Sequence, residues 1–163
     1  MIFKELELKG SYSISLEPKE DERGFFSRVF CQNDFSSKGL EHNWVQINNS
    51  FNKDKGTLRG MHMQINPHDE VKLVKCIQGE IFDVIVDLRK DSKTFGNWVG
   101  KKLTSKNREM MYVPSGFAHG FLSLTDNTEI IYFSSNFYEA KAERSLYYAD
   151  ETVNINWPSE ILH

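Results

Sequence analysis

The sequence contains few cysteines, no long apolar run and no excess of basic charge. Two cysteines, Cys31 and Cys76, are too few for a disulfide-stapled scaffold, and their spacing does not fit a metal site. No segment approaches the roughly 20 apolar residues that a membrane-spanning helix needs. A formal net charge of −3 without a basic run gives no electrostatic footprint for nucleic acid. We therefore expect a cytoplasmic protein that binds neither nucleic acid nor a membrane.

Short runs of alternating apolar and polar residues, separated by turn residues, fill the chain instead. They are typical of an all-β sandwich or barrel, and 163 residues suffice for one domain with a buried core. Helical spacing of apolar residues is scarce, and one short helix is expected at 33–39, capped by Asn33 or Asp34. We predict a single all-β domain over residues 1–163, a cupin-type jelly roll or double-stranded β-helix barrel. The expected strands are 3–9, 11–17, 27–31, 44–51, 57–64, 72–78, 81–89, 98–103, 109–113, 120–124, 129–135 and 143–148.

Two glycine-framed histidines, His62 and His119, stand on or beside predicted strands. Strict strand alternation places Arg59 and His62 on opposite faces of their strand. Both can face one site only if Gly60 marks a β-bulge, a role that glycine often takes in strands. Alternation also puts Lys72 on an apolar strand face, so this lysine either extends to solvent at the strand end or lies in a cavity.

Asp83 and Asp87 share a strand face with apolar neighbours, so either carboxylate can turn inward. For Asp87 we expect an ion pair with Arg89 at the protein surface, where the strand ends. For Asp83 the alternation leaves the direction of the side chain open.

Three interpretations of the histidine pair remain open: a metal site, packing in the core, or proton transfer. A transition-metal site needs three or four ligands, and no acid follows His62 before Asp69 and Glu70, so we expect no metal. A core histidine would be satisfied by a backbone carbonyl. Proton transfer next to a carbonyl requires a base, a cation and an acid, and the predicted strands carry all three. These residues are Arg59, His62, Lys72, His119 and Tyr132.

The chain resembles the dTDP-4-dehydrorhamnose 3,5-epimerases, a family of nucleotide-sugar enzymes with a metal-free cupin fold. The resemblance extends along most of the chain and keeps the order and spacing of the family's motifs. It implies an isomerase without a cofactor, acting in deoxysugar biosynthesis such as that of lipopolysaccharide O-antigens. The matching segments are 21–26, 46–50, 56–62, 72–74, 79–84, 86–96, 113–121, 143–144 and 156–158, together with Tyr132 and Tyr138.

The resemblance also implies roles for individual residues. His62 would be the base that removes the proton from C3 or C5 of a 4-keto-6-deoxy sugar, and Tyr132 the acid that reprotonates the opposite face. Lys72, with Arg59, would polarise the C4 carbonyl and stabilise the enolate. Tyr138 would stack on the nucleotide base. The other residues implied to hold the nucleotide diphosphate sugar are Arg23, Gln46, Asn48, Arg59, His119 and Glu143.

The family is dimeric, so the resemblance implies a homodimer in which the N-terminal strand at 3–9 is exchanged. The partner would then supply part of each site. Three departures stand against the family pattern. Arg28 replaces an acidic residue, Phe133 replaces a lysine, and the late aspartate that pairs with the catalytic histidine is not found up to His163. We therefore expect His62 to be a less effective base unless Asp83 supplies the carboxylate.

Several functions remain open at this point. The first is epimerisation at C3 and/or C5 of a dTDP-4-keto-6-deoxyhexose. The second keeps this chemistry but inverts one centre only, or uses a CDP or GDP sugar. The third is a ketoisomerase that moves the carbonyl between C3 and C4, and the fourth is a sugar-nucleotide binding protein without catalysis. We predict the first.

Overall fold

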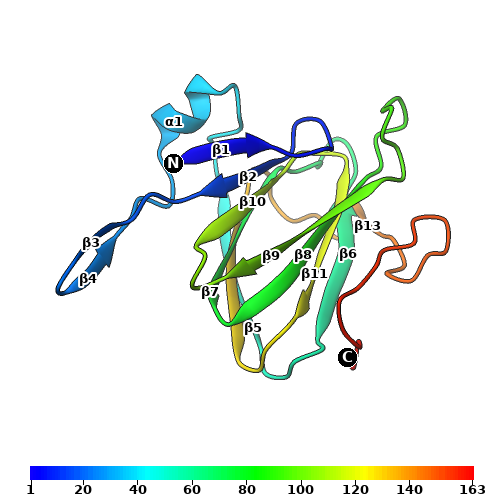
Figure 1. The fold of residues 1–163 in the computed structure, drawn as a ribbon. Coiled ribbons are helices and arrows are strands. Elements are labelled where there is room, and N and C mark those ends of the chain that lie inside the picture. The colour runs from blue at the N-terminus through cyan, green and yellow to red at the C-terminus, as the bar shows by residue number, and fades with distance from the viewer.

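The computed structural model describes residues 1–163 as two antiparallel sheets that pack face to face in a jelly-roll barrel (Figure 1). The strands are β1 (Ile2–Glu5), β2 (Tyr12–Ser15), β3 (Lys19–Asp21), β4 (Gly24–Phe26), β5 (Gln46–Asn52), β6 (Leu58–Gln64), β7 (Lys72–Gln78), β8 (Glu80–Asp87), β9 (Trp98–Thr104), β10 (Glu109–Val113), β11 (Phe117–Ser123), β12 (Thr128–Ser134) and β13 (Glu143–Ser145). One sheet has the order β1-β2-β10-β7-β12-β5 and the other β13-β6-β11-β8-β9. The predicted all-β jelly roll is confirmed.

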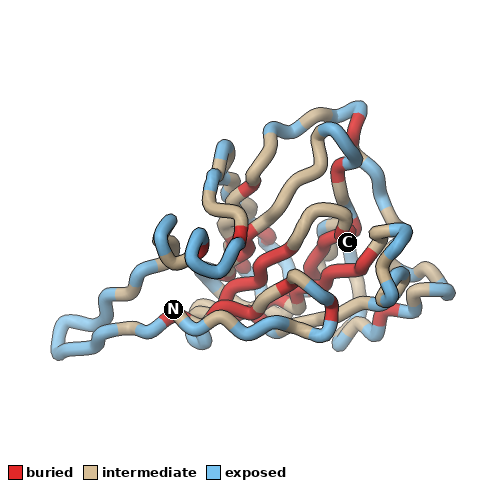
Figure 2. The backbone as a smooth tube through the Cα atoms, turned by 90° about the horizontal axis from the view of Figure 1, so that it is seen from above, coloured by how far each residue is buried: buried red, intermediate tan, exposed pale blue.

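The main core lies between the two sheets, where the inward-facing side chains of the central strands are apolar. Figure 2 shows that the buried residues, in red, gather along the strands in the middle of the molecule. Along β7 the inward residues change from Lys72 at one end to the buried Val74 and Cys76. Phe117 on β11 and Ile130 on β12 belong to the same cluster. Each such side chain contributes roughly 1.5–3 kcal/mol when fully buried. One end of the barrel is therefore filled with apolar side chains, while the other end has room for polar ones.

Helix α1 (Gln32–Ser37) covers part of the outer face of the six-stranded sheet. Its Phe35 is fully buried against Leu73 and Met110 of that face. The N-cap residue is Cys31, and its side chain makes no capping hydrogen bond. The expected N-caps, Asn33 and Asp34, are therefore wrong: they lie two and three residues further along, inside the helix.

The predicted strand at 27–31 is also wrong. These residues form a loop whose Val29 and Phe30 pack against the helix cluster, so tertiary contacts explain their apolar character. The strand pairing lies just before them, in the β3–β4 hairpin, which projects away from the barrel (Figure 1).

The expected Asp87–Arg89 ion pair forms, but its carboxylate is fully buried rather than at the surface. Asp87 accepts hydrogen bonds from Arg89 Nη2 at 2.7 Å, Ser92 Oγ at 2.5 Å and Thr94 Oγ1 at 2.7 Å. Burial alone would raise the pKa of Asp87, but these hydrogen bonds outweigh it and hold the pKa well below its usual range. The carboxylate thereby fixes the loop between β8 and β9.

The N-terminal strand β1 pairs with β2 of its own chain, with Ile2 opposite Ser15. An exchange of this strand between two chains is a property of an assembly, so it stays a prediction. The chain has no helix with the length and apolar character that membrane crossing requires.

Candidate active site

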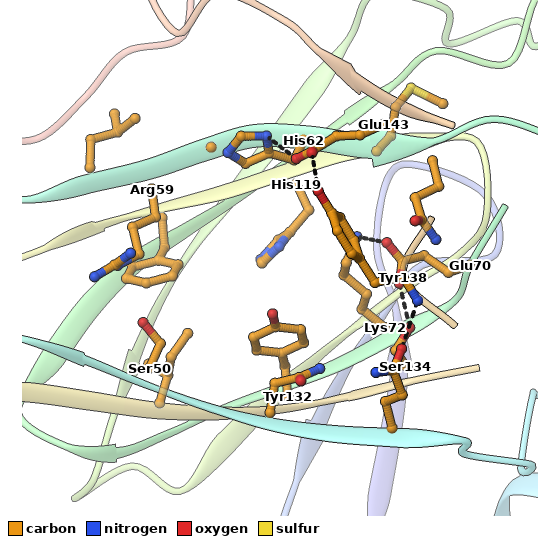
Figure 3. Close-up of a pocket in the computed structure, with 18 residues that line it drawn as sticks. Ser50, Arg59, His62, Glu70, Lys72, His119, Tyr132, Ser134, Tyr138 and Glu143 are labelled. Atoms are coloured by element: carbon orange, nitrogen blue, oxygen red, sulfur yellow. Dashed lines mark hydrogen bonds and ion pairs between the residues drawn. The ribbon is translucent and has the colours of Figure 1, made fainter. Parts of the chain in front are cut away.

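A cavity of about 730 Å³ opens at the polar end of the barrel, between the two sheets (Figure 3). Nine of the ten residues predicted for the site line it, and Arg23 is the exception. The lining consists of Gln46, Asn48, Ser50, Leu58, Arg59, Gly60, His62, Met63, Gln64, Glu70, Lys72, His119, Phe121, Ile130, Tyr132, Ser134, Tyr138 and Glu143.

The bulge at Gly60 that a shared site requires is present, and both Arg59 and His62 line the same cavity. His119 of β11 lies opposite His62, but Phe121 lies opposite Arg59, so β6 contains one extra residue. Gly60 has a φ of +133°, and a Cβ there would lie 2.5 Å from the Cα of Gly120. Only glycine fits this close approach of two strands.

His62 contacts the carboxylate of Glu143, at 3.0 Å from its Nδ1 to Oε1. The other oxygen of Glu143 accepts a hydrogen bond from the Tyr138 hydroxyl at 2.8 Å. This bond is the first cause of a raised pKa of Tyr138, followed by burial and the charge of Glu143. Figure 3 shows the three side chains in one continuous chain at the mouth of the cavity.

Asp83 is not the partner of His62. Its Oδ1 lies 2.8 Å from Nε2 of His119, and its side chain is fully buried. The second oxygen, Oδ2, has no hydrogen-bond partner. Asp83 turns inward as the alternation of β8 allows, but β8 pairs with β11 and not with β6, so the carboxylate meets His119. Nδ1 of His119 is left as the ring nitrogen available to a bound molecule.

Lys72 and Tyr132 enter the cavity from the opposite, six-stranded sheet. Lys72 Nζ lies 2.6 Å from Oε1 of Glu70, and both side chains are largely buried. The other oxygen of Glu70 accepts a hydrogen bond from Ser134, the residue opposite Lys72 on β12. Burial, and then the charge of Glu70, raises the pKa of Tyr132. The phenol therefore stays protonated at neutral pH, and its hydroxyl points into the cavity (Figure 3).

The residues that sequence reasoning missed are Glu70, Ser134, Ser50 and Gln64. Glu70 precedes β7 by two residues, so its proximity to Lys72 was a usable signal. Gln64 gave no such signal: its amide bonds the backbone of His68, Phe137 and Glu139, and so holds the loop that carries Tyr138.

Arg59 and Gln46 belong to the part of the cavity expected to hold the nucleotide. Arg59 Nε donates to Asn52 Oδ1 at 2.6 Å, which anchors the guanidinium at the cavity edge. Gln46 Oε1 accepts a hydrogen bond from the backbone N–H of Tyr138 at 2.7 Å, while the Tyr138 side chain is 62% exposed. The exposed Tyr138 ring offers a face on which a base can stack, and the Arg59 guanidinium can bind phosphate oxygens.

Arg23 lies in the β3–β4 hairpin, fully solvent-exposed and paired with Asp21. Arg28 is also exposed, and Phe133 packs against Trp44 on the outer face of the sheet. Neither Arg28 nor Phe133, the two residues that depart from the family pattern, lines the cavity. Within residues 1–163, no three His, Cys, Asp or Glu side chains are grouped so that they could hold a metal ion. A reaction without metal or cofactor stays a prediction.

The chain is similar to proteins of known family and structure. The family described as dTDP-4-dehydrorhamnose 3,5-epimerase matches residues 5–163. The chain is 47% identical over 145 residues to the dTDP-4-dehydrorhamnose 3,5-epimerase of Shigella flexneri, a match that covers 87% of this chain and 80% of that protein.

Two solved structures show the same fold. The enzyme of that name from Bacillus anthracis, with TDP and PPi bound, is 37% identical with a TM-score of 0.95, and the match covers 99% of this chain and 94% of that one. An epimerase from Legionella pneumophila in complex with dTDP-4-keto-L-rhamnose is 35% identical with a TM-score of 0.93, covering 99% and 86%. The chain belongs to the dTDP-4-dehydrorhamnose 3,5-epimerase family.

Proposed function

We propose that this protein is an isomerase that epimerises a dTDP-4-keto-6-deoxyhexose at the carbons next to its C4 ketone. The observation that carries the proposal is the placement of His62 and Tyr132 in one cavity on opposite sheets. Inversion requires that a proton leaves one face of a carbon and another arrives on the opposite face. A base and an acid on facing walls of a cavity meet that requirement.

The chemistry follows from the ordinary properties of the side chains. His62 takes the proton from C3 or C5, and the electron pair of the broken C–H bond moves to the C4 carbonyl oxygen as an enolate. The Lys72 ammonium stabilises the charge that develops there. Tyr132 then donates its proton to the same carbon from the other side, which its raised pKa allows. Both residues return to their starting state by exchange with solvent.

The nucleotide would occupy the part of the cavity lined by Gln46, Asn48 and Arg59, with the base on the Tyr138 ring. The guanidinium of Arg59 suits a pyrophosphate because its N–H groups bind phosphate oxygens in pairs. The relatives support this class of ligand, since TDP is bound in the Bacillus anthracis structure and a dTDP sugar in the Legionella pneumophila structure.

A homodimer is part of the proposal. Arg23 lies on a projecting hairpin outside the cavity of its own chain, so it can serve a site only on a second copy (Figure 1). We also place the protein in the cytoplasm, because Cys31 and Cys76 are both free thiols.

The test is incubation of the protein with dTDP-4-keto-6-deoxyglucose in heavy water, followed by NMR at C3 and C5. We expect deuterium at one or both carbons together with inversion. Deuterium at one carbon only would identify a single-centre epimerase, and a 3-keto product a ketoisomerase. Absence of exchange at both carbons, with wild type equal to His62→Ala, would show that the protein is not an epimerase for this sugar.

A further inference from the structure

We propose that Glu143 is a positioning residue: its carboxylate holds the imidazole of His62 in the tautomer that a base needs. This inference rests on the proposed function, in which His62 removes the substrate proton. It assigns Glu143 a different role from the substrate contact predicted from the sequence.

The position of Glu143 is set by strand pairing. Short strand β13 pairs with β6, so that Ser145 lies opposite His62 and Glu143 lies opposite Gln64. The side chain of Glu143 therefore starts two residues along from His62 on the neighbouring strand, within reach of the ring.

The carboxylate of Glu143 is itself oriented by a second contact. Tyr138 donates its hydroxyl proton to Oε2 at 2.8 Å, which leaves Oε1 directed at Nδ1 of His62 at 3.0 Å (Figure 3). The hydroxyl of Ser145 is 3.5 Å from the same nitrogen, too far to orient the ring by itself.

The other carboxylates at the cavity already have partners. Asp83 is bound to His119, and Glu70 is bound to Lys72 and Ser134. Within residues 1–163, Glu143 is the carboxylate that contacts His62.

The contact between Glu143 and His62 affects the tautomer of the imidazole rather than the stability of the fold. The His62 side chain is 50% exposed, and an exposed pair of this kind contributes little to folding. A neutral imidazole carries one N–H, however, and a carboxylate beside Nδ1 requires that the proton be there. Nε2 then keeps its lone pair and can accept a proton from carbon. Glu143 thus acts through His62 and touches no reacting atom.

The experiment compares wild type with Glu143→Ala, and it needs no substrate for its first measurement. Long-range ¹H–¹⁵N NMR reports the tautomer of the His62 ring, whose signals are assigned by their loss in His62→Asn. We expect the Nδ1–H form in wild type and its loss in Glu143→Ala. Glu143→Gln keeps an acceptor oxygen and should restore the Nδ1–H form in part.

The second measurement is the kinetics of deuterium entry. We expect kcat to fall at least roughly tenfold in Glu143→Ala, with little change in KM, because a histidine base held in the wrong tautomer can lose up to about 10⁴-fold in kcat. The matched control is Glu151→Ala, which removes an exposed carboxylate outside the cavity and should change neither the tautomer nor kcat.

An unchanged tautomer in Glu143→Ala would overturn the proposal, and so would a raised KM with unchanged kcat, which would place Glu143 against the substrate. If wild type has no activity, the proposed function fails, but the NMR result still decides whether Glu143 sets the tautomer.

Discussion

His62 and His119 lie directly opposite each other on β6 and β11, and each ring contacts a different carboxylate. The carboxylate that contacts His62, Glu143, is about one-third exposed at the cavity mouth, whereas the carboxylate that contacts His119, Asp83, is fully buried. The two imidazoles therefore stand side by side in different environments. This difference agrees with one ring in proton transfer and the other in substrate binding.

The buried pair leads to a prediction for Asp83. Asp83→Asn replaces the charged acceptor of His119 by a neutral amide oxygen, which accepts a weaker hydrogen bond, so the orientation of the ring is held less firmly. A hydrogen bond to a charged group is worth about 1.5–3 kcal/mol, and KM should rise roughly tenfold or more while kcat changes little. Steady-state kinetics of the deuterium exchange measure both constants. A fall in kcat at constant KM would mean that His119 takes part in the chemical step.

Removing the acid should separate exchange from inversion. Tyr132→Phe keeps the ring but lacks the hydroxyl, so His62 can still remove the substrate proton and return deuterium to the same face. NMR in heavy water should then show deuterium at the carbon without a change of configuration, whereas His62→Asn should show no exchange. Inversion at the wild-type rate in Tyr132→Phe would assign the acid to another residue.

Gly60→Ala should damage both the fold and the site. The new Cβ would lie 2.5 Å from the Cα of Gly120, at a φ of +133°. We expect a loss of about 2 kcal/mol or more in the free energy of unfolding, with a loss of activity because Arg59 and His62 shift apart. The control is Gly39→Ala, which also has a positive φ, of +67°, but faces open space. Urea unfolding of Gly39→Ala should show a loss of about 1 kcal/mol in the free energy of unfolding, and the variant should retain its activity.

Asp87→Asn should lower stability without touching the cavity. The carboxylate is buried and bonded to Arg89, Ser92 and Thr94, so its removal should cost about 2–4 kcal/mol at pH 7. Because folding lowers the pKa of Asp87, its contribution is complete above the unfolded value of about 3.9 and is lost as the pH falls below it. Denaturant unfolding at pH 7 and at about pH 3 should show the gap between wild type and variant narrowing in acid. A constant gap would mean that the charge of Asp87 is not what stabilises the loop.

Much of the barrel followed from the alternation of apolar and polar residues. The strands β7 and β10 have the predicted bounds, and most others differ by one to three residues at an end. The failure at 27–31 has a simple cause: Val29 and Phe30 are apolar because they cover α1, and a short apolar run does not reveal its partner. The β3–β4 hairpin is short and exposed, and its residues Lys19–Asp21 and Gly24–Phe26 show no alternation of apolar and polar residues to detect.

The site was predictable where a residue's own strand determines its direction. Gly60 allowed the possibility that Arg59 and His62 face one cavity, because a glycine inside a strand is a known position for a bulge. The partners of the two histidines were not predictable, since they depend on which strands are neighbours. The alternation left the direction of Asp83 open, and only the order β13-β6-β11-β8 explains that Asp83 reaches His119 and that Glu143 reaches His62.

The division of the barrel into a filled end and a hollow end has a consequence for how this protein can be altered. On β7, Lys72 and Val74 are two residues apart on one strand face, yet the first lines the cavity and the second is wholly enclosed. Substitutions at the hollow end can change substrate preference at little cost to folding, because few apolar contacts are lost there. Directed evolution of new sugar specificities should therefore concentrate on the inward residues of β5, β6 and β12 near the opening, and leave the opposite end of the same strands intact.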